Sequence, residues 1–227
     1  MSTRKTTVRK AASASGHERA SPWDHPSSRE EQREAKRQAV LQAAAELFNE
    51  RGFHATSLDD VAARLNVSKP TLYYYVRSKE EILLQCVNKG LQMAREGIGE
   101  SRRAGGQPID QLIACMRVYG TIVTMDFGMC IIRVGEEGLS AEGRKELRQL
   151  KAGIDHEFRR LVAECVEQGA LVPCDPKLTA FAIAGALSWI AHWYRPGGAY
   201  SREEVVEQCV STLLNGVLRR PELPLGR

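Results

Sequence analysis

The 227-residue sequence has neither a paired-cysteine framework nor a long apolar segment. Its six cysteines are scattered, with no Cys-x-x-Cys pair and no spacing to histidine of the kind that binds zinc, which argues against a disulfide scaffold or a zinc module. The N-terminus lacks the apolar core of a signal peptide, and no apolar run approaches membrane-spanning length. We therefore expect a soluble, cytoplasmic protein with reduced thiols and no membrane partner.

Patterns typical of enzymes and of strand proteins are also missing. There is no strand-like alternation, no internal repeat, no nucleophile paired with a base, and no cofactor-binding loop. His156 stands between Asp155 and Glu157, but neighbours on a helix are ~100° apart and cannot converge on one metal or proton. The sequence therefore predicts no enzyme activity, no metal site and no cofactor.

Positive charge is concentrated near the N-terminus. The formal net charge is +4, and residues 1–28 hold five basic against two acidic side chains. This segment is rich in Ser, Ala and Thr, contains Pro22 and Pro26, and has no periodicity, so we expect a disordered basic arm. The alternative is an arm that orders on DNA by entering a minor groove. Residues 221–227 are expected to form a short tail.

Hydrophobic periodicity predicts helices from about residue 29 onward. The first is amphipathic and ends at Gly52, and its apolar face is formed by Val40, Leu41, Ala44, Leu47 and Phe48. Ser57 and Asp60 resemble a capping box at the start of a second helix, and Ser78 opens another after the break at Asn66. Two short helices joined by about three residues predict a helix-turn-helix domain over residues 29–78.

The rest of the chain, residues 79–220, is predicted to form a larger helical domain. Helix-like spacing of apolar residues covers 109–123 and 140–169. Capping signals at Asp175 and Ser201 open the last two helices. The predicted fold class is all-α.

The predicted recognition helix contains three consecutive tyrosines. Leu72 and Val76, four residues apart, define its buried stripe. At ~100° per residue, Tyr74 points directly away from the core, while Tyr73 and Tyr75 lie ~80° to either side. For Tyr73 and Tyr75, packing at the helix margin is an equal alternative to a contact with DNA.

Other residues of this segment suit a DNA groove. Pro70 and Thr71 share the outward hemisphere with Tyr74, and Lys69 lies at the exposed N-terminal edge. Phenol hydroxyls reach phosphates and Thr71 reaches a base edge. Helix N-termini at Ser57 and at Ser78, where Lys79 adds a charge, are natural phosphate clamps; the alternative for Lys79 is an ordinary surface lysine.

The run from Gly52 to Leu83 closely resembles the DNA-binding signature of the TetR (tetracycline-repressor) family of bacterial regulators. The matching residues are Gly52, Phe53, Thr56, Val61, Ala62, Val67, Ser68, Thr71, Leu72, Tyr73, Lys79, Glu80, Ile82 and Leu83. The resemblance implies an all-α homodimer with an N-terminal helix-turn-helix domain of three helices and a larger C-terminal effector domain. The predicted DNA-binding residues are Thr56, Ser57, Ser68, Lys69, Pro70, Thr71, Tyr73, Tyr74, Tyr75 and Lys79. Two residues depart from the family: Asn66, commonly Gly, and Tyr75, often His.

The last two helices are the predicted dimer interface. The helix over residues 177–194 is apolar on nearly every side and rich in small residues, so it must be buried in a core or against a partner. The family resemblance implies a four-helix interface made by two such helix pairs. An intramolecular core helix is the alternative.

An effector pocket is predicted in the C-terminal domain. Residues 188–205 weakly resemble a TetR subset associated with fatty-acid and steroid degradation, whose effectors are often acyl-CoA thioesters. A pocket for such a ligand needs apolar walls and a few polar anchors. The candidate residues are Met116, Arg117, Tyr119, Phe127, Met129, Arg133, Phe158 and Trp189. Core packing is the alternative for each.

Together these patterns predict a ligand-responsive repressor that binds a double-stranded DNA operator as a dimer. A small hydrophobic effector would release it. The alternatives are an activator, a regulator without an effector, and a helical enzyme with an incidental helix-turn-helix.

Overall fold

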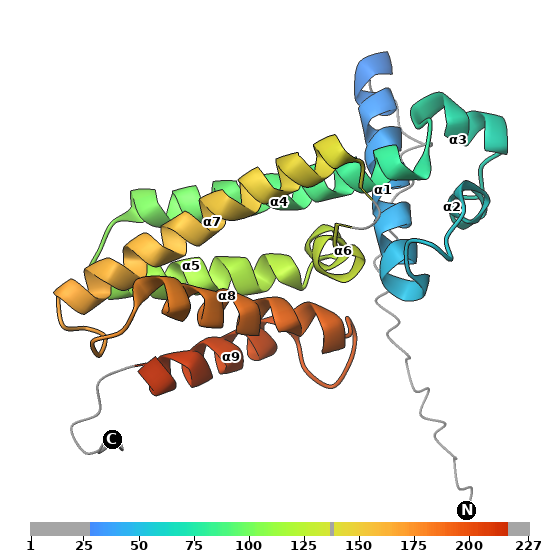
Figure 1. Ribbon diagram of the computed structural model, residues 1–227. Coiled ribbons are helices and arrows are strands. Elements are labelled where there is room, and N and C mark those ends of the chain that lie inside the picture. The colour runs from blue at the N-terminus through green and yellow to red at the C-terminus, as the bar shows by residue number, and fades with distance from the viewer. Residues whose placement is uncertain (1–27, 137–138, 218–227) are drawn as a thin grey trace, which may run out of the picture.

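The computed structural model describes residues 28–136 and 139–217 (Figure 1). These residues form helices and no strand, so the predicted all-α fold is confirmed. The helices are α1 (Arg29–Arg51), α2 (Leu58–Arg64), α3 (Lys69–Tyr75), α4 (Lys79–Ala104), α5 (Pro108–Val123), α6 (Asp126–Val134), α7 (Ala141–Glu167), α8 (Pro176–Trp193) and α9 (Arg202–Val217). The predicted arm and the C-terminal tail lie outside the described residues, apart from Ser28.

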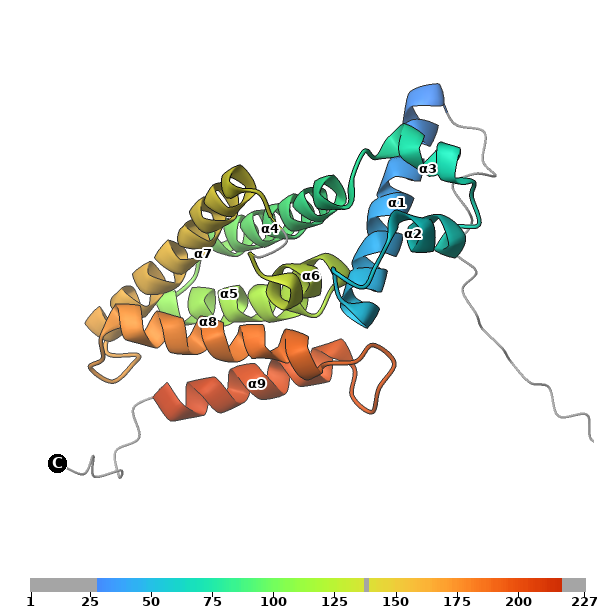
Figure 2. The same ribbon diagram turned by 45° about the vertical axis from the view of Figure 1, so that its right-hand side comes forward.

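The first three helices form a compact unit at one end of the molecule. α1 stands across the end of the C-terminal helices, with α2 and α3 on its far side (Figures 1 and 2). It begins at a capping box between Ser28 and Glu31 and ends at Gly52, whose φ of 87° takes the chain out of the helix. Its apolar face packs with Leu72, Val76 and the first half of α4 in one hydrophobic cluster.

The turn between α2 and α3 depends on Asn66. Its φ is 54°, and it is the non-glycine residue with a positive φ in the described part of the chain. Asn tolerates this left-handed conformation better than most side chains. The predicted tight turn is therefore present, and Asn66 adopts the left-handed conformation at a position where relatives commonly have Gly.

The remaining helices form a layered bundle. α5 lies at its centre and contacts α4, α7, α8 and α9, while α8 and α9 form the outermost layer (Figures 1 and 2). The predicted start signals are confirmed, because Asp175 caps α8 and Ser201 pairs with Glu204 at the start of α9. Within the described residues, no single helix is long and apolar enough to cross a membrane, although α5 and α6 satisfy that test as a pair bent by 80°.

Sequence patterns did not predict α6. This short helix has Met125 at its N-cap position, and it has neither the side-chain cap of most other helices nor the proline that marks the start of α5. Gly128 makes its position possible, because a Cβ there would lie 1.9 Å from the main-chain oxygen of Ile122. α6 contacts both α1 and α8 and thus joins the two ends of the fold.

Candidate DNA interface

The recognition helix α3 presents its tyrosines as its helical geometry dictates. Leu72 and Val76 are each 1% exposed, which confirms the predicted buried stripe. Tyr74 is 69% and Tyr73 is 53% exposed. Tyr75 is half-buried, packs against the first hydrophobic cluster, and meets the Tyr74 ring edge-on with centroids 5.1 Å apart. The face available to a DNA groove is therefore built from Tyr73 and Tyr74, while Tyr75 supports it.

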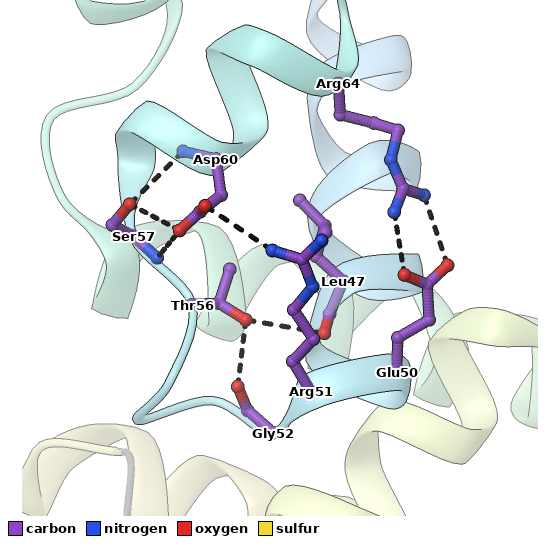
Figure 3. Close-up of polar contacts among 8 residues, drawn as sticks. All are labelled: Leu47, Glu50, Arg51, Gly52, Thr56, Ser57, Asp60 and Arg64. Carbon is purple, nitrogen blue, oxygen red and sulfur yellow. Dashed lines mark hydrogen bonds and ion pairs between the residues drawn. The ribbon is translucent and has the colours of Figure 1, made fainter.

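The N-terminus of α2 is closed by a reciprocal cap (Figure 3). The Asp60 amide donates to Ser57 Oγ, and both the Ser57 amide and hydroxyl donate to the Asp60 carboxylate. These hydrogen bonds lower the pKa of Asp60, and Arg51 lies 3.5 Å from the carboxylate. The predicted capping box is confirmed, and Ser57 remains exposed at the helix end.

Thr56 is placed differently from the other predicted DNA contacts. Its side chain is buried, with the residue 2% exposed. The hydroxyl lies 2.9 Å from the Gly52 carbonyl and 3.3 Å from the Leu47 carbonyl (Figure 3). Its hydroxyl therefore fastens the loop to α1 instead of facing outward.

A bidentate ion pair holds α2 against α1. Arg64 donates to the two carboxylate oxygens of Glu50 at 3.2 and 2.7 Å (Figure 3), and Glu46 lies 3.7 Å away. The paired geometry lowers the pKa of Glu50 and raises that of Arg64. Because the pair is partly exposed, it orients α2 more than it stabilises the fold.

The N-terminus of α3 carries four of the predicted contacts. Ser68 caps the helix by accepting from the Thr71 amide, and their hydroxyl oxygens lie 2.8 Å apart. Lys69 forms an exposed ion pair with Asp59 at 2.7 Å, which raises the pKa of the lysine. Pro70 is exposed beside them. An exposed ion pair of this kind can exchange a carboxylate for a phosphate at little cost.

Lys79 has a structural task. Its ammonium donates to the Phe53 carbonyl at 2.8 Å and lies 4.5 Å from the centroid of the Phe53 ring. A weaker contact reaches the His54 carbonyl. Lys79 thus ties the start of α4 to the loop that precedes α2, which positions the N-terminus at Ser57.

The structure does not gather the eight predicted effector residues around one pocket. Met116 and Phe158 are fully buried core residues, while Arg117 forms a surface ion pair with Glu207 between α5 and α9. Trp189 is 64% exposed on α8. The sequence did not show on which side of its helix each of these apolar or long side chains would lie.

The other predicted effector residues are distributed among three places. Met129 and Arg133 line a cleft between α1, α6 and the α8–α9 turn, and Phe127 packs against the first hydrophobic cluster. Tyr119 faces a small cavity enclosed by α4, α5, α6 and α7, and its hydroxyl lies 2.8 Å from Ser188 Oγ. Burial raises the pKa of Tyr119.

The cavity beside Tyr119 has apolar walls and basic surroundings. Its volume is about 40 Å³, and Lys151 contributes its cation. An adjoining groove of about 180 Å³ shares Leu91 and Ile154 with it and carries two cations, Arg95 and Arg102, against one carboxylate, Glu157, which is paired with Arg160. Sequence patterns missed these residues because a pocket wall on an amphipathic helix has the same spacing as a core. Among the described residues, no group of three or more His, Cys, Asp or Glu is placed to hold a metal.

The fold and the outward face of α3 define the class: an all-α DNA-binding regulator of the helix-turn-helix type. Two family models match the chain. Residues 40–86 match "Bacterial regulatory proteins, tetR family", and residues 105–217 match "Tetracyclin repressor-like, C-terminal domain". The chain belongs to the tetR family of bacterial regulators. It is a transcriptional regulator that binds DNA, and not an enzyme.

Known members show how far the similarity extends. The transcriptional regulator RutR of Escherichia coli is 32% identical over 152 residues, which cover 66% of this chain and 70% of RutR. The transcriptional repressor KstR2 of Mycobacterium tuberculosis is 22% identical over 82% of this chain and 94% of its own length; its structure has a TM-score of 0.75, with 21% identity and coverage of 82% and 96%. The structure of AibR with isovaleryl coenzyme A and operator DNA has a TM-score of 0.70 and 27% identity, covering 79% of this chain and 98% of AibR.

Proposed function

We propose that the protein is a cytoplasmic, homodimeric repressor that a small hydrophobic effector, an acyl-CoA thioester, releases from its operator. The observation that carries the proposal is the pairing of an apolar cavity with a basic groove inside the C-terminal bundle. The AibR complex, which has the same fold, contains both an acyl-CoA and operator DNA. KstR2, similar over most of both chains, is a repressor.

The exposed face of α8 supports a dimer. Ile183, Leu187 and Ile190 are buried against the bundle, but Leu178 and Trp189 are 67% and 64% exposed. The exposed face continues through Phe181, Ala182, Gly185, Ala186 and Trp193. These positions recur at helical spacing, so they form one apolar stripe. A stripe of this length on a free surface is typical of a protein–protein interface.

We propose that a second copy of the chain packs against this stripe. Two recognition helices must sit about 34–36 Å apart to enter successive major grooves, which a two-fold dimer achieves. The small residues Ala182, Gly185 and Ala186 let a partner helix approach closely, and the larger side chains at either end provide the buried area. α9 lies beside α8 and completes a helix pair on each subunit.

The effector site is proposed between α4 and α7. The acyl chain would enter beside Leu91 and Ala94, while Arg95 and Arg102 at the adjoining groove would bind coenzyme A phosphates. A cavity of about 40 Å³ is far smaller than the roughly 300–1,000 Å³ of ligand pockets. Binding therefore requires the helices around it to move apart.

That movement would reach the DNA interface through α4. Its first half, including Ile82, Cys86 and Val87, is packed in the cluster that holds α1 and α3. Its middle, at Gly90, Leu91 and Ala94, borders the cavity. A ligand that widens the cavity shifts α4, and a shift of α4 changes the separation of the two recognition helices; by linkage, DNA must then disfavour the ligand equally.

The test of release is operator binding by gel shift with and without a series of acyl-CoAs. We expect release by some members of the series, and weaker release from an Arg95→Gln/Arg102→Gln variant, whose operator affinity without ligand should match the wild type. Release that is equal in both proteins would reject the groove as the site. An operator complex insensitive to every acyl-CoA, or transcription that rises with added protein, would reject the proposed effector or the repressor role.

The test of the dimer is light scattering after gel filtration. Ala186→Glu places a charge in the middle of the α8 stripe and should give a monomer with unchanged helix content. The control is Glu203→Gln at an exposed site on α9 outside this stripe. A dimeric Ala186→Glu protein would show that the interface lies elsewhere.

A further inference from the structure

A basic hollow adjoins the recognition helix on the side of α1. It has a volume of about 370 Å³ and lies between the first turns of α1 and the C-terminal end of α3. Its charged lining residues are Arg29, Glu30, Arg33 and Lys36, so three cations face one carboxylate. These charged residues lie outside the predicted DNA contacts, none of which is on α1.

Helix geometry explains why these cations gather. Arg29, Arg33 and Lys36 stand at i, i+4 and i+7, which places them within ~60° of arc on α1. The nearby acids Glu31 and Glu34 point elsewhere: Glu31 accepts from the Ser28 amide, and Glu34 accepts from the Gln38 side chain. The result is a continuous basic stripe along the first two turns.

The stripe touches the recognition helix directly. The Arg33 guanidinium lies 6.0 Å from the centroid of the Tyr74 ring, within the range of a cation–π contact. Tyr74 and Tyr75 also line the hollow. The most exposed ring of the recognition helix is therefore continuous with the basic stripe, and both belong to one surface.

The two arginines of the stripe are available to an anion. Arg29 and Arg33 are exposed, and neither has a carboxylate partner within the part of the chain that the structure describes. Arg37, one residue beyond Lys36, differs: it donates to Gln85 and lies 3.9 Å from Glu81. The positive end of the α1 dipole adds to the field of the stripe.

We propose that this hollow binds a backbone phosphate of the operator, flanking the groove that α3 enters, with Arg29 and Arg33 as its ligands. Guanidinium groups bind phosphate oxygens in bidentate geometry. The site rests on the DNA-binding function, yet it precedes the residues matched by the family model: α1 begins eleven residues before residue 40. The proposed phosphate site therefore extends the DNA interface onto the first turns of α1, which the family model does not cover.

Salt dependence of binding tests this site, because each neutralised phosphate contributes a slope of about −0.9 to log K against log salt concentration. The variant is Arg29→Gln/Arg33→Gln, and the matched control is Lys145→Gln/Arg148→Gln, two exposed cations on α7. Both should be measured by fluorescence anisotropy on a duplex selected by the wild-type protein and on a random duplex, over ~50–200 mM salt.

We expect the Arg29→Gln/Arg33→Gln variant to flatten the slope by about 0.9 on both duplexes, while the control keeps the wild-type slope. Arg33→Lys should retain most of the slope. Equal slopes in wild type and variant, or equal flattening in variant and control, would overturn the site.

One further measurement separates binding of DNA from binding of free phosphate. If inorganic phosphate raises the melting temperature of the wild type but not of the variant, while the DNA slopes stay equal, the hollow binds free phosphate and not DNA. Acyl-CoA takes no part in these measurements, so failure of the proposed effector leaves the test intact. Rejection of the phosphate site would likewise leave the proposed DNA contacts of α3 unaffected.

Discussion

Arg133 on α6 donates a hydrogen bond to the main-chain carbonyl of Asn49 at the end of α1, at 2.9 Å and across 84 residues of sequence. The same guanidinium donates to the carbonyls of Ala191 and Tyr194 at the end of α8. In the opposite direction, the Asn49 side chain donates a hydrogen bond to the main-chain oxygen of Asp126, the first residue of α6. Burial lowers the pKa of Arg133. One side chain therefore joins the DNA-binding unit to the helix of the proposed dimer interface.

Replacing Arg133 should destabilise the protein. Arg133→Met removes three hydrogen bonds; the carbonyls of Asn49 and Ala191 lose the guanidinium, while that of Tyr194 keeps its contact with Arg195. We therefore expect a loss of about 2–3 kcal/mol in the free energy of unfolding. The matched control is Arg117→Met, which breaks a half-exposed ion pair with Glu207 and should cost less than about 1 kcal/mol. Urea unfolding measures both. Equal losses would mean that the Arg133 contacts contribute no more than a surface pair.

Substitutions of Tyr74 and Tyr75 should affect different properties: operator affinity for Tyr74 and thermal stability for Tyr75. Tyr74→Ala removes an exposed ring from the DNA face and should weaken operator binding about tenfold, ~1.4 kcal/mol, with little change in stability. Tyr75→Ala removes a ring that packs against the core cluster, so it should lower the melting temperature. Anisotropy and thermal unfolding report the two effects. Normal operator binding by Tyr74→Ala would show that this face does not meet DNA.

Lys79 should act through the loop that it holds. Lys79→Met removes the hydrogen bond to the Phe53 carbonyl, so we expect a loss of stability of about 1–2 kcal/mol together with weaker operator binding. If Lys79 only positions the loop, the salt slope of binding stays as in the wild type. If it also contacts a phosphate, the slope flattens by about 0.9. Unchanged stability and affinity would contradict both roles.

The buried thiols should make the protein less stable at alkaline pH. Burial raises the pKa of Cys115 and of Cys130 to about 12, from an ordinary value of 9.0. The folded state keeps these thiol protons, while the unfolded chain releases them above pH ~9. The contribution of the two thiols to the free energy of unfolding is therefore complete below pH ~9, and it is lost as the pH rises toward ~12. Each thiol adds a slope of about 1.4 kcal/mol per pH unit in this window.

Urea unfolding at about pH 8 and about pH 10.5 tests this dependence. Cys130→Ala should reduce the difference between the two conditions, whereas Cys174→Ala, at a half-exposed site, should leave it unchanged. An identical pH dependence in all three proteins would show that the thiols do not cause it.

Local rules predicted the helices with capping signals and amphipathic spacing. Ser57, Asp175 and Ser201 start helices where predicted, because a side-chain cap acts on the residues beside it in the sequence. α6 was missed because its position is decided by close packing against the end of α5 at Gly128. No local pattern encodes that contact.

The roles of individual site residues were harder to predict. The four-residue spacing of Leu72 and Val76 fixed the outward direction of Tyr74, since helix geometry alone relates these positions. Thr56 and Lys79 lie in the predicted segment, but their polar atoms turn inward to main-chain carbonyls. Whether a polar side chain meets DNA or its own backbone depends on where the loop lies.

The sequence by itself determined the fold class, the helix-turn-helix and the outward ring of Tyr74, because periodicity and capping are local properties of a helix. Only the tertiary structure decided that Arg133 links α1 to α8 and that the stripe of Arg29 and Arg33 lies against Tyr74. These relationships join residues tens of positions apart, and their energy exists only once the helices are packed.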